Sequence, residues 1–237
     1  MNTCADIIAR LREIAVPERK AGMARFGIDI TRALGVTLPE LRQLAKRIGT
    51  NHALAGELWE SGLHEARILA GMVDDPAQVT PAQMEAWAQT FDSWDVTDQC
   101  VNNLFRKTPR AHDMAAKWTQ AEAEFVKRAG FALIAALAVH DRHADDQAFV
   151  AFFPLIAQAA GDRRNFVKKA VNWALRQIGK RNMALNHEAI RLAETLRQQP
   201  HASAKWIAAD ALRELTNPKI LARIHQKNSS RNHPNCA

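Results

Sequence analysis

The sequence contains no tyrosine and few of the residues that form tight turns. Only 10 glycines and 9 prolines occur among its 237 residues, which is about 8% of the chain against an average near 12%. A β-sandwich or β-barrel needs many turns, so this composition argues against both architectures. The aromatic residues are biased towards tryptophan, of which there are six.

The chain also lacks a long apolar run and a cysteine framework. The longest uncharged apolar run, 129–139, is about half of the ~20 residues that a membrane-spanning helix needs. The N-terminal segment has no basic stretch followed by an apolar one, so we expect no signal peptide. Cys4, Cys100 and Cys236 are scattered and form no CxxC motif, which favours a cytoplasmic protein without a disulfide framework or zinc site.

Acidic residues are in the minority. The chain has 32 Lys and Arg against 25 Asp and Glu, giving a formal net charge of +7 and a pI near 9.7. A basic protein of this kind is suited to a polyanionic partner. Because 47% of the residues are hydrophobic, burial of apolar surface can offset chain entropy, and we expect a folded protein.

Apolar residues recur at helical spacing almost throughout the chain. Thr80 followed by Pro81 has the pattern of a capped helix start, and Asn217 followed by Pro218 repeats it. We expect no long strand, one domain over 1–226, and a disordered basic tail over 227–237. The expected helices are 3–15, 18–34, 38–49, 52–61, 63–74, 81–90, 93–106, 109–118, 122–139, 144–160, 163–180, 186–199, 202–215 and 218–226.

A faint internal repeat accompanies these helices. Similar segments begin at Val126, Val167 and Ala204, which places them 41 and 37 residues apart. Periods of this size are typical of stacked helix pairs of the HEAT or armadillo type. We therefore predict an all-α protein, a right-handed superhelical stack of HEAT-like antiparallel helix pairs with a concave basic groove.

The expected helix 163–180 carries an indole on a basic face. Its apolar stripe consists of Val167, Val171, Ala174 and Ile178. Roughly opposite that stripe lie Lys169, Trp173, Arg176 and Lys180. Trp173 either packs against a neighbouring helix or contacts a nucleotide beside cations that neutralise phosphates.

The expected helix 93–106 places an indole and a carboxylate on one face. Trp94 and Asp98 are four residues apart, and Asp98 lies at the edge of the apolar stripe. This carboxylate either pairs with Lys or Arg of the next helix or has a role in chemistry. Asp95 points elsewhere and can serve the helix N-terminus.

The expected helix 122–139 is apolar nearly all round, yet it carries Lys127 and Arg128 near its start. An arginine in a buried helix either pairs with an internal acid or projects into a cleft to hold an anion. Arg67, on an earlier helix, presents the same alternatives.

Three blocks in this order resemble the DNA alkylation repair family of HEAT-like glycosylases, of the AlkD type. They are DSWDVTD at 92–98, FVKRA at 125–129 and NFVKKAVNWALR at 165–176. Segments 35–42 and 58–67 are similar to the same family, and the likeness covers about residues 22–215. The blocks are specific in combination and weak singly.

The resemblance implies a role for each candidate residue. Asp98 would be the catalytic carboxylate, Trp94 and Trp173 would flank the deoxyribose of the lesion, and Arg128 would lie near the DNA backbone. The remaining DNA-binding cations would be Lys169, Arg176, Lys180, Lys127 and Arg67. The implied activity is excision of cationic N3- or N7-alkylated purines from duplex DNA by a monomer that needs no cofactor or metal and has no membrane partner.

Two alternatives remain open from the sequence. The first is a non-catalytic HEAT-like protein that binds distorted or branched DNA, which charge and tryptophan placement fit equally well. The second is a helical-repeat scaffold for an acidic protein. Only Asp98 favours the enzyme, because a purely electrostatic DNA binder gains nothing from an acid in its cleft.

Overall fold

Helices and short connections make up the computed structural model, which describes residues 3–232, with side chains described as far as residue 226. No β-strand occurs among these residues, which confirms the all-helical prediction. The chain divides into two compact units, Met1–Ala111 and His112–Ala237, and each is described by itself. Our expectation of one domain over 1–226 stays a prediction, because continuous helical stacks also contain compact units.

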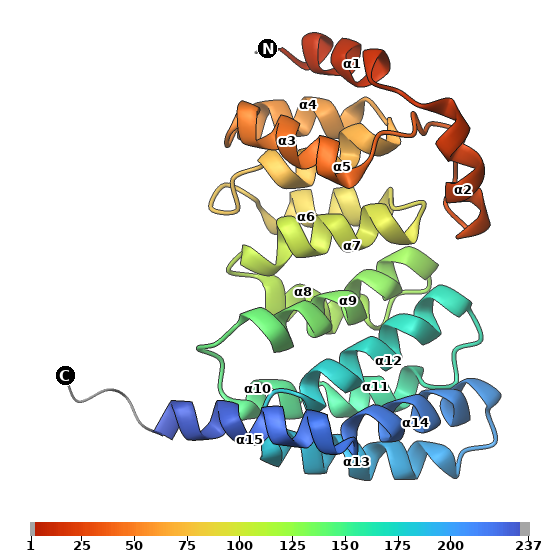
Figure 1. Cartoon of the computed structure of the whole chain (residues 1–237), viewed down its shortest axis with the longest axis vertical. Helices are drawn as coiled ribbons and strands as arrows, with labels where there is room; N and C mark the ends of the chain where they lie inside the picture. The colour runs from red at the N-terminus through yellow and green to blue at the C-terminus, as the bar shows by residue number, and fades with distance from the viewer. Residues whose placement is uncertain (1–2, 233–237) are drawn as a thin grey trace. The chain divides into compact units, whose positions relative to one another are not determined.

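The first unit is built on a central buried helix. Figure 1 shows α3, α4 and α5 packed side by side, and α5 also packs against α7. Its elements are α1 (Cys4–Glu13), the 3₁₀ helix η1 (Pro17–Arg19), α2 (Lys20–Arg25), α3 (Leu38–Ile48), α4 (His52–Glu60), α5 (His64–Val73), α6 (Pro81–Gln89), α7 (Trp94–Asn103) and the 3₁₀ helix η2 (Phe105–Lys107).

Aromatic side chains hold the interior of the first unit together. Trp59 of α4 and Trp87 of α6 stack with their ring centroids 4.1 Å apart, and Phe91 meets Trp59 edge-on. Such a pair contributes about 0.5–1.5 kcal/mol beyond the burial of its area. These two tryptophans are therefore structural.

The connection after α2 differs from the prediction. A single helix was expected over 18–34, but α2 ends at Arg25. Gly35 has a φ of +81°, and a Cβ there would lie 2.2 Å from the Val16 carbonyl oxygen, so a side chain is excluded. The buried Glu65 carboxylate accepts hydrogen bonds from the backbone N–H groups of Leu34, Gly35 and Val36. These bonds replace the ones a helix would provide.

The second unit contains the helices that carry most of the predicted cations. Figure 1 shows α12 beside both α9 and α14, and these helices pack on one another. The elements are α8 (Ala111–Trp118), which begins at the boundary, α9 (Glu124–His140), α10 (Asp146–Val150), α11 (Phe153–Ala159), α12 (Asn165–Gly179), α13 (Met183–Arg197), α14 (Ala202–Leu215) and α15 (Pro218–Asn232). As predicted, α9 is buried on nearly all sides.

Two segments of the second unit differ from the prediction. The helix expected over 144–160 is two helices, α10 and α11, and Pro154 stands in the first turn of α11, where its missing N–H removes no helical bond. Helix α15 extends to Asn232, so it enters the segment 227–237 for which we predicted disorder. Residues 233–237, including Cys236, lie outside the described residues.

The described residues contain neither a membrane-spanning helix nor a cluster of metal ligands. None of the described helices is long and apolar enough to cross a membrane. Residues 3–226 hold no group of three or more His, Cys, Asp or Glu side chains that could bind a metal ion. The predicted handedness of the superhelix and its concave groove concern the whole chain and stay predictions.

Candidate functional site

The start of α7 carries the predicted indole and carboxylate. Ser93 is the N-cap residue in an extended conformation, so Trp94 is the first residue of the helix. Asp98 follows one turn later, and both side chains are half-buried. The predicted arrangement of Trp94 and Asp98 on one helical face is therefore present.

The Trp94 ring is held by the segment that follows α2. Its Nε1 donates a hydrogen bond to the Phe26 carbonyl oxygen at 3.0 Å. The Phe26 side chain itself is 71% exposed. Because the indole is anchored by its polar edge and half-buried, Trp94 has a defined position without lying inside the hydrophobic core.

A buried ion pair fixes the N-terminus of α7 on α5. His64 Nε2 lies 2.9 Å from Asp95 Oδ2, and the other Asp95 oxygen accepts from Ser93 Oγ and from the Val96 backbone N–H. Burial lowers the pKa of His64, but the hydrogen bond and charge of Asp95 outweigh it and raise that pKa. Burial likewise opposes ionisation of Asp95, but His64 and its other donors leave the pKa of Asp95 lowered.

Arg67 ties α5 to the turn before α7. Its guanidinium donates to the Thr90 carbonyl oxygen and to Asp92 Oδ2, both at 3.1 Å. It also lies over the Trp59 ring, 5.5 Å from the centroid. These contacts give Arg67 a structural role, and its predicted contact with DNA stays a prediction.

In the second unit, α12 and its C-cap residue Lys180 carry four of the predicted residues. Lys169 is exposed, and Trp173, Arg176 and Lys180 are half-buried. Arg176 and Lys180 both form ion pairs with Glu214 of α14. The pKa of Glu214 is lowered, because these two cations outweigh the effect of its burial.

The ion pairs of α12 change the electrostatics of the predicted basic face. The Arg176 Nε also lies 3.5 Å from Asp210 Oδ2. Two of the cations expected to neutralise phosphates are therefore largely neutralised by acids of α14. Lys169 forms no ion pair with any described residue, so of these three cations it has the charge most available to a ligand.

Lys127 and Arg128 both reach the start of α12. Arg128 is buried on α9, and its Nη1 donates to the Phe166 carbonyl oxygen at 2.8 Å. Lys127 Nζ lies 3.7 Å from Asp162 Oδ2, which Arg164 also binds at 2.6 Å. Burial opposes the ionised form of Asp162, but Arg164 and Lys127 lower its pKa.

The candidate residues are divided between the units. Arg67, Trp94 and Asp98 belong to the first unit, and the others belong to the second. Sequence analysis missed two features: the His64–Asp95 pair and the support of segment 34–36 by Glu65. The only sign of these two features in the sequence was that His64 and Glu65 fall within segment 58–67, which is similar to the family.

The comparisons with known proteins agree with this arrangement of helices. The model of a family described as "DNA alkylation repair enzyme" matches residues 7–215. The chain belongs to that family. The comparison with curated proteins finds no match.

A solved structure is similar to the fold of this DNA alkylation repair family member. It comes from work on "a new family of proteins related to the HEAT-like repeat DNA glycosylases with affinity for branched DNA structures". The TM-score is 0.74 at 18% sequence identity, and the match covers 89% of this chain and 94% of the other. This likeness supports the predicted stack of HEAT-like helix pairs.

Proposed function

We propose that this protein is a DNA glycosylase that excises cationic N3- or N7-alkylated purines from duplex DNA. The observation that carries the proposal is the position of Asp98, half-buried one helical turn from the anchored indole of Trp94. Membership of the alkylation repair family supports alkylated DNA as the substrate.

The proposed chemistry needs one carboxylate. Alkylation at N3 or N7 makes the purine a cation, which departs as a neutral base without a general acid. Asp98 would stabilise the positive charge that develops on the deoxyribose and position the attacking water. This differs from glycosidases that use a pair of carboxylic groups.

The two indoles would assist the same step. Trp94 and Trp173 would flank the deoxyribose, and each aromatic face would stabilise its cationic form by about 0.5–2 kcal/mol. Trp94 belongs to the first unit and Trp173 to the second.

DNA binding would rest on contacts with phosphates and would not depend on sequence. Lys169 is the strongest candidate, because its exposed side chain has no acidic partner among the described residues. Arg128 would contribute through a position fixed by a carbonyl oxygen. Lys127 and Arg67 would contribute less, because Asp162 and Asp92 pair with them. The same holds for Arg176 and Lys180, whose charges are offset by Glu214 and Asp210.

A non-catalytic protein that binds branched DNA is the second candidate. It is favoured by the description of the similar solved structure, whose family has affinity for branched DNA. In that case Asp98 would have no role in excision, and Asp98→Asn would leave the binding of branched DNA unchanged.

Release of alkylated bases distinguishes the two candidates. The wild type, Asp98→Asn and the exposed control Glu60→Gln are each incubated with methylated duplex DNA, and the 7-methylguanine that each protein releases is measured. We expect release by the wild type and the control, and a loss of about 10²-fold or more in Asp98→Asn with duplex binding retained. No release by the wild type would refute the glycosylase, and equal release by Asp98→Asn would refute the role of Asp98.

A further inference from the structure

Helices α12 and α14 are joined by a regular series of polar pairs in the second unit. Asn172 Nδ2 donates to Asp210 Oδ2 at 2.6 Å. One turn further along both helices, Arg176 forms an ion pair with Glu214. The two partners are 38 residues apart in each case, so the helices lie in constant register. In this series, side chains of α12 donate to carboxylates of α14.

One turn before Asn172, the residue on α14 is an aromatic residue and no longer an acid. Lys168 and Trp206 occupy the equivalent positions, four residues before Asn172 and Asp210, and therefore lie on the same helical faces. The Lys168 ammonium lies over the Trp206 ring, 4.7 Å from its centroid. An indole attracts a cation through its quadrupole but carries no net charge. The positive charge of Lys168 is thus retained, unlike that of Arg176.

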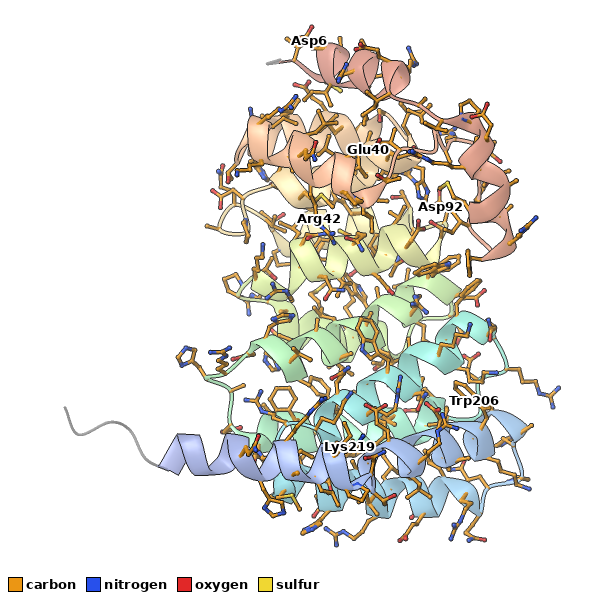
Figure 2. All side chains as sticks on the ribbon, in the orientation of Figure 1. Asp6, Glu40, Arg42, Asp92, Trp206 and Lys219 are labelled. Carbon is orange, nitrogen blue, oxygen red and sulfur yellow. The ribbon has the colours of Figure 1, made fainter. Side chains whose placement is uncertain are left out.

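The Trp206 indole is partly open to a ligand, although Lys168 lies over one face of its ring. It is 41% exposed, and the other large exposed hydrophobic side chains of the described residues, Phe26 and Val139, are on other helices or loops. Figure 2 shows Trp206 at the surface of the second unit, where α12 and α14 lie together. Lys205 is exposed beside it, and neither Lys168 nor Lys205 forms an ion pair with a described residue.

A partly exposed indole with one lysine over its ring and a second, exposed lysine next to it in the sequence has the features that bind single-stranded nucleic acid. Every nucleobase has a face that stacks on an indole, and lysines bind the adjoining phosphates. A membrane surface would require a wider apolar stripe, whereas the neighbours of Trp206 on α14, Lys205 and Asp210, are charged. The geometry therefore favours an unpaired nucleotide over a lipid surface.

We propose that Trp206, Lys168 and Lys205 form a secondary DNA-binding site that stacks an unpaired base of a single-stranded branch or overhang. This site rests on the proposed DNA-binding function and adds to it, because none of its three residues belongs to the candidate catalytic site. The α12–α14 series positions it: Asp210 and Glu214 hold α14 in register, so that the indole meets Lys168.

The test compares three DNAs that share one duplex. The first is blunt, the second carries a single-stranded overhang of about six nucleotides, and the third carries an overhang of abasic residues with the same phosphates. Fluorescence anisotropy at one salt concentration gives the Kd of each for the full chain. We expect the overhang with bases to bind about tenfold more tightly than the blunt duplex, and the abasic overhang to lose most of that gain.

The variants separate stacking from charge. Trp206→Ala should bind the overhang with bases no more tightly than the abasic overhang, and Trp206→Phe should retain part of the preference for bases. Lys168→Ala with Lys205→Ala should weaken both overhangs. The matched control is Arg213→Ala, an exposed cation on α14 that already pairs with Asp210, and it should retain the full preference.

The outcomes distinguish this site from the proposed function. If no DNA binds, the DNA-binding function itself fails and the secondary site fails with it. If the blunt duplex binds but Trp206→Ala leaves the preference for the overhang unchanged, the secondary site is refuted and the function stands. Binding of anionic phospholipid vesicles that depends on Trp206, without any preference for overhangs, would also refute it.

Discussion

His64 and Asp95 form a buried ion pair that joins the first turn of α5 to the first turn of α7, with His64 Nε2 2.9 Å from Asp95 Oδ2. Asp95 lies next to Trp94 in the sequence and also receives the backbone N–H of Val96. The pair therefore holds the first turn of α7 against α5, and with it the helix that carries Trp94 and Asp98.

Asp95→Asn should destabilise the protein in a pH-dependent manner. The raised pKa of His64 gives stability that is complete below its unfolded value of about 6.5 and is lost as pH rises through the folded pKa. The lowered pKa of Asp95 gives stability that is complete above about 3.9 and is lost as pH falls through the folded pKa. We expect a loss of about 2–4 kcal/mol near pH 5.5 and less at pH 9.

Urea unfolding of both proteins at the two pH values measures this difference. His64→Ala should behave in the same direction, because it removes the same pair. A loss of stability that is equal at pH 5.5 and pH 9 would show that the pair does not act as an ion pair.

Glu65→Gln should loosen the segment that follows α2. The carboxylate accepts three backbone N–H groups, at Leu34, Gly35 and Val36, whereas an amide has one acceptor oxygen and must turn its NH₂ group towards donors. We expect a loss of about 1–3 kcal/mol. Hydrogen exchange at the Gly35 amide should become faster, and unchanged exchange there would contradict the assigned role of Glu65.

The errors in the predicted fold have both local and distant physical origins. The start of α6 was predicted from Thr80 and Pro81, whose capping acts within four residues. The helix expected over 18–34 ends at Arg25, just before Gly27 with its φ of +74°, and Glu65 holds segment 34–36 from about thirty residues away. Periodicity reports which residues share a face, but it contains no information on a distant acceptor that competes with helical hydrogen bonds.

The candidate site shows the same division between local and distant effects. The common face of Trp94 and Asp98 follows from their spacing on one helix and was predicted. The neutralisation of Arg176 and Lys180 depends on Glu214, which lies on another helix, and could not be predicted from the pattern of α12. An exposed charge is a property of the packed helices, so sequence spacing alone overestimates the number of cations available to DNA.

Lys169→Ala and Arg176→Ala should therefore differ. Lys169→Ala should weaken binding evenly across DNA sequences, flatten the salt dependence by about one unit and leave stability unchanged. Arg176→Ala should flatten it less but lower the free energy of unfolding by about 1–2 kcal/mol, because it removes one of the two cationic partners of Glu214. Salt titrations of duplex affinity with parallel urea unfolding measure both quantities. Identical behaviour of the two variants would show that the ion pairs of α12 do not limit its contact with DNA.

Phenylalanine substitutions of the two indoles should separate the role of the ring from that of its anchor. Both retain an aromatic face that can stabilise a cationic sugar, although the indole binds cations more strongly. Trp94→Phe also loses the hydrogen bond to the Phe26 carbonyl, so the ring is no longer fixed beside Asp98. We expect single-turnover release of 7-methylguanine to fall about tenfold or more in Trp94→Phe and only a few-fold in Trp173→Phe, with duplex affinity retained in both. A larger loss in Trp173→Phe than in Trp94→Phe would mean that the anchored position of Trp94 contributes nothing to excision.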